Sequence, residues 1–221
     1  MTVGLNVAIS LAFTYNREQS ERKELENNRL QEELKYLKQQ ISPHFLMNVL
    51  NNIHAMAEEN IKGAQEMILE LSCLLRHVLY DSENEMTSLA SESRFIASYI
   101  ALMKMRYVEG IVQVNLDIQE QNSDDARIPP LLLISFIENA FKHGVSYNSG
   151  TIINIKLCEA DGKILFTCDN TKPLKKDSGT EGGVGLSNVR RRLELLYGDN
   201  YSLEINETKT IHSVTLIIPC R

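Results

Sequence analysis

The sequence predicts an α+β protein in which a helical region precedes a mixed region of strands and helices. Apolar residues recur at helical spacing from about residue 30 to residue 107. Strict alternation of apolar and polar residues then begins in IVQVNLDI, which is typical of a half-buried strand. The change of period near Gly110 predicts a boundary between a helical domain, 17–109, and an α/β domain, 110–221.

Composition narrows the class of protein. Of 221 residues, 43% are apolar and 24% charged, as in ordinary globular proteins. The net charge of −6 argues against direct nucleic-acid binding, because proteins that bind nucleic acid are usually basic. Four widely spaced cysteines without a CxxC pair indicate reduced thiols in a cytoplasmic compartment.

The first residues are strongly apolar. VGLNVAISLAF, residues 3–13, is shorter than the about 20 residues of a membrane span. It also lacks the basic start and the small-residue cleavage site of a signal peptide. Because basic residues follow it, we expect 1–16 to be the cytoplasmic end of a transmembrane helix. An ordinary buried helix is the alternative.

A heptad seam follows in a highly charged stretch. Leu30, Leu34, Leu37 and Ile41 are spaced four, three and four residues apart, which predicts a short coiled coil and a homodimer. Most of the flanking charged residues form a solvated face.

Pro43 interrupts this helical pattern directly before His44. Proline has no amide hydrogen and crowds the preceding turn, so it marks either a kink or a new helix capped by Ser42. The apolar residues that follow share one arc: Leu46, Leu50, Ile53 and Ala57. The opposite side of the same helix carries His44, Asn48, Asn51 and Ala55. We expect an exposed His44 with Asn48 one turn away, which suits a nucleophile; an ordinary surface histidine is the alternative.

Two further helices complete the helical region. The first follows a break at Lys62–Gly63, and its apolar face comprises Met67 or Ile68, Leu71, Leu74, Leu75 and Val78. The helices on either side of this break predict an antiparallel hairpin, and two hairpins would form a four-helix dimer bundle. The second is expected from about Leu89 to Tyr107.

The α/β region has clear turn and helix signals. IPPLLLISFIENAFKHG predicts a helix that begins with its prolines and ends at Gly144. TIINIKLCEADGKILFTCDN predicts two strands joined by an Asp161–Gly162 turn. GLSNVRRRLELLYG predicts a helix that ends at Gly198, and YSLEINE with HSVTLIIP predicts a last hairpin.

Two stretches of this region could bind a phosphorylated ligand. ENAFKHG places Glu138, Asn139, Lys142 and His143 on successive helical turns, where they can cluster at one rim. An asparagine oxygen can ligate magnesium, and basic groups can neutralise phosphate. The alternative is a helix end whose basic residues suit the helix dipole.

The second stretch, GTEGGVGLSNVRRRL, is rich in glycine just before a helix. Such a loop lets phosphate approach the backbone, and the helix N-terminus favours negative charge. It lacks the GK[ST] of a P-loop and the preceding strand of a dinucleotide fold. A merely flexible loop is the alternative.

Three motifs together resemble one family. QISPHFLMNVLNNI resembles the phosphoacceptor segment of LytS-like sensor histidine kinases, PPLLLISFIENAFKHGV their N box, and GGVGLSNVRRRLELLYG their G box. The resemblance covers the chain from about residue 18 to the end. It implies a helical-hairpin dimerisation and phosphotransfer region, followed by a GHKL (Bergerat-type) α/β sandwich that binds ATP. It also implies a bacterial membrane protein whose kinase region is cytoplasmic and whose partner is a response regulator receiver domain.

The resemblance implies a role for individual residues. His44 would be phosphorylated, and Asn48 and Glu138 are the further catalytic candidates, with Glu138 ordering water or assisting proton removal. Asn139 would hold Mg²⁺. The remaining candidates for the ATP site are Lys142, His143, Asp169, Asn170, Gly183, Gly185, Leu186, Asn188 and Arg192. Of these, Gly183 and Gly185 would form the edge of the lid, supported by Asn188 and Arg192.

The chain departs from the family pattern at two places. Phe45 stands where many histidine kinases carry an acid, although neutral histidine is already nucleophilic. The adenine-binding DNGxG is replaced by residues 169–173, DNTKP, which lack its glycines. Strand alternation puts Phe166 and Cys168 on the same face as Asn170, so Asn170 could replace Asp169 at the adenine.

The sequence thus predicts a histidine kinase that uses ATP and Mg²⁺ to phosphorylate His44 and passes the phosphoryl group to an aspartate of a regulator. The alternative is a degenerate dimeric signalling scaffold with little or no kinase activity.

Overall fold

A computed structural model describes residues 19, 23, 43–80, 84–107, 110–119, 126–146, 150–173 and 184–220. The chain divides into two units, Met1–Gln40 and Ile41–Arg221, and every element below belongs to the second. The predicted membrane segment at 1–16 and the coiled-coil seam from Leu30 to Ile41 lie outside the described residues. Within the described residues, no helix combines the length and the apolar character of a membrane span.

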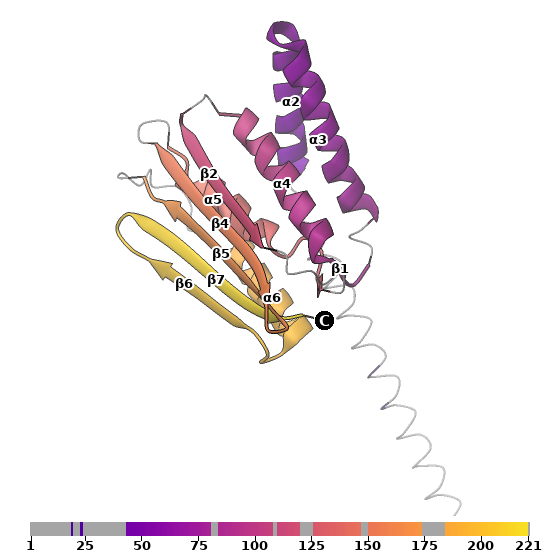
Figure 1. The fold of residues 1–221 in the computed structure, drawn as a ribbon, viewed down its shortest axis with the longest axis vertical. Helices are drawn as coiled ribbons and strands as arrows, with labels where there is room; N and C mark the ends of the chain where they lie inside the picture. The colour runs from indigo at the N-terminus through magenta and orange to yellow at the C-terminus, as the bar shows by residue number, and fades with distance from the viewer. Residues whose placement is uncertain are drawn as a thin grey trace, which may run out of the picture. The chain divides into compact units, whose positions relative to one another are not determined.

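Helices α2, Pro43–Glu59, and α3, Ile61–Tyr80, form the predicted antiparallel hairpin (Figure 1). The break falls at Asn60, so the prediction of a break at Lys62–Gly63 was wrong. Asn60 Oδ1 accepts a hydrogen bond from the Gly63 amide at 2.9 Å, which satisfies a free donor at the start of α3. A β-carbon on Gly63 would come within 2.8 Å of Met56 Sδ, so this glycine allows a close helix contact.

The apolar arc of α2 is shifted from the predicted one. Phe45 and Val49 are buried, whereas Leu50 is 50% exposed and Ala57 is also exposed. The reason is the Phe45 ring, which stacks on Tyr99 with 4.9 Å between ring centroids and turns its own side of α2 inward. In α3, Met67, Leu71 and Leu74 are buried as predicted.

Helix α4, Leu89–Met105, confirms the third predicted helix, and it packs against α3 and against β2. Its first residue is tied to the α/β region, because the Leu89 amide donates to the Ala126 carbonyl at 2.8 Å. Two short strands that the sequence did not predict, β1 (Thr87–Ser88) and β3 (Arg127–Ile128), pair beside it. The domain boundary at 109/110 stays a prediction.

A five-stranded sheet has the order β2-β4-β5-β7-β6. Its strands are β2 Val112–Gln119, β4 Thr151–Ala160, β5 Lys163–Thr171, β6 Ser202–Glu207 and β7 Ile211–Pro219. β2 runs parallel to β4, and the other neighbours are antiparallel. Asp161 and Gly162 both have positive φ, 52° and 68°, as a two-residue type I′ turn requires.

Helices α5, Ile134–Gly144, and α6, Val184–Tyr197, lie on one side of this sheet (Figure 1). α6 ends at Tyr197, and the next residue, Gly198, has a φ of 57°, which suits a glycine directly after a helix. α5 ends at Gly144 as predicted, but it begins at Ile134 and not at the prolines. The reason is a turn before it in which Leu131 has a φ of 59°, outside the helical range. The predicted fold class, α+β with a helical hairpin followed by an α/β sandwich, is confirmed.

Candidate functional site

Helix α5 presents a polar arc. Its apolar side, which includes Phe136, Ile137 and Phe141, is buried against the sheet and neighbouring helices. The helical period of 3.6 residues therefore gathers the polar residues on the other side. These are Glu138 and Asn139, which are partly buried, and Lys142 and His143, which are exposed. The structure thus brings together four of the predicted site residues.

The C-terminal end of α5 is held by two strands. The Thr151 hydroxyl of β4 donates to the Gly144 carbonyl at 3.0 Å and accepts from the Ser146 amide at 3.1 Å. From β5, the Asn170 side chain packs on Gly144, where a β-carbon would lie 2.7 Å from Asn170 Nδ2. Asn170 is therefore adjacent to the last turn of α5, two strands from the sheet edge.

Asn170 and Asp169 point to opposite faces of β5. Asn170 is 3% exposed, lies on the same face as Phe166 and Cys168, and donates to the Thr171 carbonyl at 3.0 Å. Asp169 instead accepts a hydrogen bond from the Ser213 hydroxyl on β7. The structure brings Asn170, and not Asp169, to the side of the sheet that carries α5. Their roles at the adenine stay predictions.

Burial alters the proton affinity of Glu138. Desolvation raises the pKa of this carboxyl to about 7, although the charge of Lys142 acts to lower it. Near neutral pH, Glu138 is therefore poised between its protonated and ionised forms. A group with such a pKa can accept or release a proton at little cost, which suits general acid–base work.

The pKa of His143 shifts in the opposite direction, to a lower value. Partial desolvation of its ring is the main cause that lowers its pKa from the ordinary histidine value, and the Lys142 charge and His212 act in the same direction. This shift favours the uncharged ring at neutral pH, and Lys142 is the other basic side chain of this part of the arc. In its uncharged form, His143 can offer a ligand hydrogen bonds and not a charge.

Tyr99 connects α5 with the start of α2. Burial is the main cause that raises the pKa of Tyr99, and the Glu138 charge is the second. The Tyr99 ring meets Phe141 of α5 edge-on, with 6.3 Å between ring centroids. The same tyrosine ring stacks on Phe45, the neighbour of His44. His44 itself lies in the first turn of α2, and its side chain is outside the described residues. Asn48, one turn further, is partly buried.

The predicted lid residues are described in part. Gly183 lies outside the described residues, and Gly185 is in the first turn of α6. Leu186 and Asn188 are partly buried, and Leu186 packs on the core. Arg192 is buried, and its Nη2 donates to the Pro130 carbonyl at 2.6 Å. Its contact is thus with the turn before α5, and support of the lid stays a prediction.

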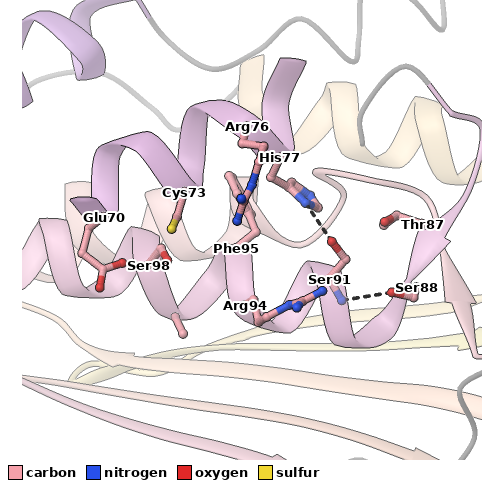
Figure 2. Close-up of a pocket in the computed structure, with 11 residues that line it drawn as sticks. Glu70, Cys73, Arg76, His77, Thr87, Ser88, Ser91, Arg94, Phe95 and Ser98 are labelled. Atoms are coloured by element: carbon pink, nitrogen blue, oxygen red, sulfur yellow. Dashed lines mark hydrogen bonds between the residues drawn. The ribbon is translucent and has the colours of Figure 1, made fainter. Parts of the chain in front are cut away.

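A separate pocket of about 720 Å³ lies between α3 and α4, next to β1. Figure 2 shows His77 of α3 directed at Ser91 of α4 in this pocket, with Arg76 and Arg94 nearby. Its lining contains none of the predicted site residues.

Sequence reasoning missed Glu92 and Tyr99, both on α4. Glu92 is fully buried although it is charged, and it lies on the same helical side as Leu89, Ile96 and Tyr99. A charged residue in the middle of an apolar arc was the available signal, because buried acids need specific partners. Tyr99 gave no such signal, since a tyrosine on an apolar arc is ordinary.

Comparison with known proteins agrees with the sequence motifs. Residues 32–111 match the family model described as histidine kinase. The sensor histidine kinase/phosphatase LytS of Staphylococcus aureus (strain N315) is 29% identical over 201 residues, which cover 85% of this chain and 34% of LytS. The chain therefore spans about a third of the length of the curated relatives it matches.

Solved structures of histidine kinases are also similar. The histidine kinase domain of the blue-light activated kinase EL346 from Erythrobacter litoralis is 16% identical, with a TM-score of 0.46, and the match covers 87% of this chain and 96% of that one. AdeS of Acinetobacter baumannii is 13% identical, with a TM-score of 0.44, and the match covers 88% of this chain and 94% of AdeS.

The chain is an α+β protein in which a helical hairpin precedes a mixed sheet with a polar helix rim. Within that class it is similar to the LytS-like sensor histidine kinases, and the resemblance predicted from the three motifs is confirmed.

Proposed function

We propose that this chain is the kinase region of a two-component sensor histidine kinase, which transfers the γ-phosphoryl group of ATP to His44. One observation carries the proposal. Phe45, next to His44, stacks on Tyr99, and the Tyr99 ring also meets Phe141 of α5 edge-on, with 6.3 Å between ring centroids. The segment that would accept the phosphoryl group and the helix that would bind its donor therefore share one tyrosine.

The polar arc of α5 fits a magnesium nucleotide. Asn139 offers one neutral oxygen, and Mg²⁺ typically takes few protein ligands and keeps phosphate and water oxygens. Lys142 is exposed and can meet a phosphate, while Asn170 is adjacent at Gly144 for the base.

The proposed reaction is an in-line displacement. A ring nitrogen of His44 attacks the γ-phosphorus, the bond between that phosphorus and the bridging oxygen breaks, and ADP leaves. The chain mainly supplies position and charge: Lys142 neutralises phosphate, and Glu138, with a pKa of about 7, can take the proton that the attacking ring loses. Magnesium, when bound, would neutralise the phosphate charge that develops.

The partners follow from the same proposal. A homodimer would form through the hairpin, whose α3 exposes one apolar stripe made of Ile61, Ile68, Leu69 and Leu79. The phosphohistidine would pass its phosphoryl group to an aspartate in a response regulator receiver domain. An N-terminal membrane segment would keep this region on the cytoplasmic side of the bacterial membrane.

Incubation with γ-labelled ATP tests the phosphoacceptor. The wild-type chain should gain a label that acid removes and base does not, and His44→Gln should abolish it. His54→Gln is the matched control, because His54 is exposed on the same helix. A label that persists in His44→Gln would contradict the assignment.

The metal role is tested separately. Asn139→Ala removes the single oxygen ligand, so binding of ATP should lose its dependence on magnesium while the melting temperature stays close to that of the wild type. The side chain is only partly buried, so no large cavity forms. Equal magnesium dependence in both chains would rule out Asn139 as the ligand.

A scaffold without kinase activity is the second candidate. It is favoured by Asp169, which bonds Ser213 and occupies the face of β5 away from Asn170. It is also favoured by the absence of the family's glycines from residues 169–173. Titration of the purified chain with ATP distinguishes the two, since a scaffold of this kind would not bind ATP.

A further inference from the structure

The turn that precedes α5 has a strained backbone. Leu131 has a φ of 59°, a left-handed conformation that leucine rarely adopts because its β-carbon approaches the backbone carbonyl. Such a residue persists when surrounding contacts hold it there, and strained positions often occur at functional sites. Leu131 lies three residues before the start of α5.

The contact that holds this turn comes from α4. Glu92 is fully buried, and its Oε2 accepts a hydrogen bond from the Leu131 amide at 3.1 Å. The same oxygen lies 3.2 Å from Nε2 of His77 on α3. Its other oxygen, Oε1, has no hydrogen-bond partner among the described residues. Burying a carboxylate costs free energy. If packing were the only role of position 92, an apolar side chain would stabilise the fold more.

A second contact reaches the same turn from α6. Arg192 donates to the carbonyl of Pro130, the residue directly before Leu131. Burial lowers the pKa of Arg192 to about 10, while the negative charge of Glu92 opposes this change, so the guanidinium stays charged near neutral pH. Neighbouring backbone groups of one turn are thus bound by an acid of α4 and a base of α6.

We propose that Glu92 is a positioning residue for the ATP site. Its carboxylate holds the left-handed turn at Leu131, and the turn fixes where α5 begins and how its polar arc faces the nucleotide. α5 is a single short helix, so a change at its start moves Glu138 and Asn139 with it. Through His77, the same carboxylate also ties the hairpin to this turn. This inference rests on the proposed function, since it concerns the site of that reaction.

Two conservative substitutions distinguish the position of the Glu92 side-chain oxygen from its negative charge. Glu92→Gln keeps an oxygen at the same distance from the Leu131 amide, whereas Glu92→Asp keeps the charge but withdraws the oxygens by one methylene. If the hydrogen bond positions α5, Glu92→Asp should weaken ATP binding about tenfold, the size expected for a lost buried hydrogen bond. The ATP affinity of Glu92→Gln should stay closer to that of the wild-type chain. A larger loss of ATP affinity in Glu92→Gln than in Glu92→Asp would overturn the proposal. Glu66→Gln, at an exposed position of α3, is the control.

A third substitution tests the strain itself. Glycine adopts the left-handed conformation freely, so a chain with Leu131→Gly no longer needs Glu92 to hold the turn. The loss of ATP affinity caused by Glu92→Asp should therefore shrink in the Leu131→Gly background, whatever Leu131→Gly costs by itself. An equal loss in both backgrounds would mean that Glu92 only packs, and would overturn the proposal.

Amide hydrogen exchange keeps the inference separate from the proposed kinase function. In the full chain without nucleotide, Glu92→Asp should speed exchange across residues 131–144 more than Glu92→Gln does. If the wild-type chain does not bind ATP, the proposed function fails. The hydrogen-exchange result alone then decides whether Glu92 positions α5. Unchanged exchange in Glu92→Asp would overturn the positioning role even in a chain that binds ATP normally.

Discussion

Gly144, the last residue of α5, is in direct contact with the Asn170 side chain of β5. A β-carbon at Gly144 would lie 2.7 Å from Asn170 Nδ2 and 3.1 Å from the Thr171 carbonyl oxygen. The first distance is shorter than ordinary packing allows, so the helix end and the strand approach each other only because position 144 carries no side chain. This contact joins the two parts of the proposed ATP site.

We therefore expect Gly144→Ala to damage the site and the fold together. The added methyl group must displace the Asn170 amide, which should cost about 1–3 kcal/mol of stability, as overpacking of a core does. ATP affinity should fall as well. Gly150→Ala is a matched control, because its β-carbon would meet open space. Titration with ATP and thermal unfolding measure both effects; a Gly144→Ala chain with wild-type affinity would contradict the contact's role.

The opposite orientations of Asn170 and Asp169 give a second prediction. Asn170→Ala should lower affinity for ATP relative to other nucleoside triphosphates, because Asn170 is on the α5 side of the sheet. Asp169→Ala should have less effect, since this carboxylate bonds Ser213 on the other face. Competition between ATP and GTP measures the preference of each variant. If Asp169→Ala were the more damaging change, the family's usual aspartate would be the adenine ligand here too.

A third prediction concerns the pH dependence of stability. Burial raises the pKa of Glu138 from 4.5 to about 7, so between these values the carboxyl ionises in the unfolded chain but stays protonated in the folded one. Stability contributed by the protonated form is complete below pH 4.5 and is lost as the pH rises to 7, by roughly 3 kcal/mol in all. Glu138→Gln cannot ionise, so it should become more stable relative to wild type across this window.

Denaturant unfolding at a series of pH values provides the measurement. The difference in the free energy of unfolding between Glu138→Gln and wild type should grow from pH 4.5 to 7 and then level off. Glu66→Gln controls for the loss of one carboxyl at an exposed position. A difference that does not change with pH would show that Glu138 ionises alike in both states.

The exposed apolar stripe on α3 gives the fourth prediction. Light scattering of the chain without its first sixteen residues should give about twice the monomer mass, as a two-fold bundle requires. Leu69→Glu should shift the mass toward that of the monomer, because Leu69 is 65% exposed in the single chain. Ile152→Glu, at an exposed apolar position on β4, should leave the dimer intact. A wild-type monomer at micromolar concentration would refute the dimer.

Most helices and strands could be predicted because their signals are local. The alternation in β2 and the Asp161–Gly162 turn are properties of neighbouring residues, and the structure has both. The same holds for the ends of α5 at Gly144 and of α6 before Gly198, where glycine follows an apolar period.

The features that could not be predicted depend on distant residues. Leu131 adopts its left-handed backbone with help from Glu92, which is far away in sequence, so IPPLLLIS read as a continuous helix start. The two-residue strands β1 and β3 are too short to have a period. In α2, the stacking of Phe45 on Tyr99 decided which side is buried, and no pattern within α2 reveals Tyr99.

The parallel pairing of β2 with β4 has a consequence for folding during synthesis. β5 and β4 meet through a two-residue turn, but β2 reaches β4 only after residues 120–150, which include β3 and α5, have been made. Pairings that close long loops form late, because loop entropy must be overcome first. As the ribosome releases the chain from its N-terminus, the apolar face of β2 emerges well before its partner strand. Within the five-stranded sheet, we expect β2 to be the strand most exposed to chaperones and to aggregation until β4 arrives.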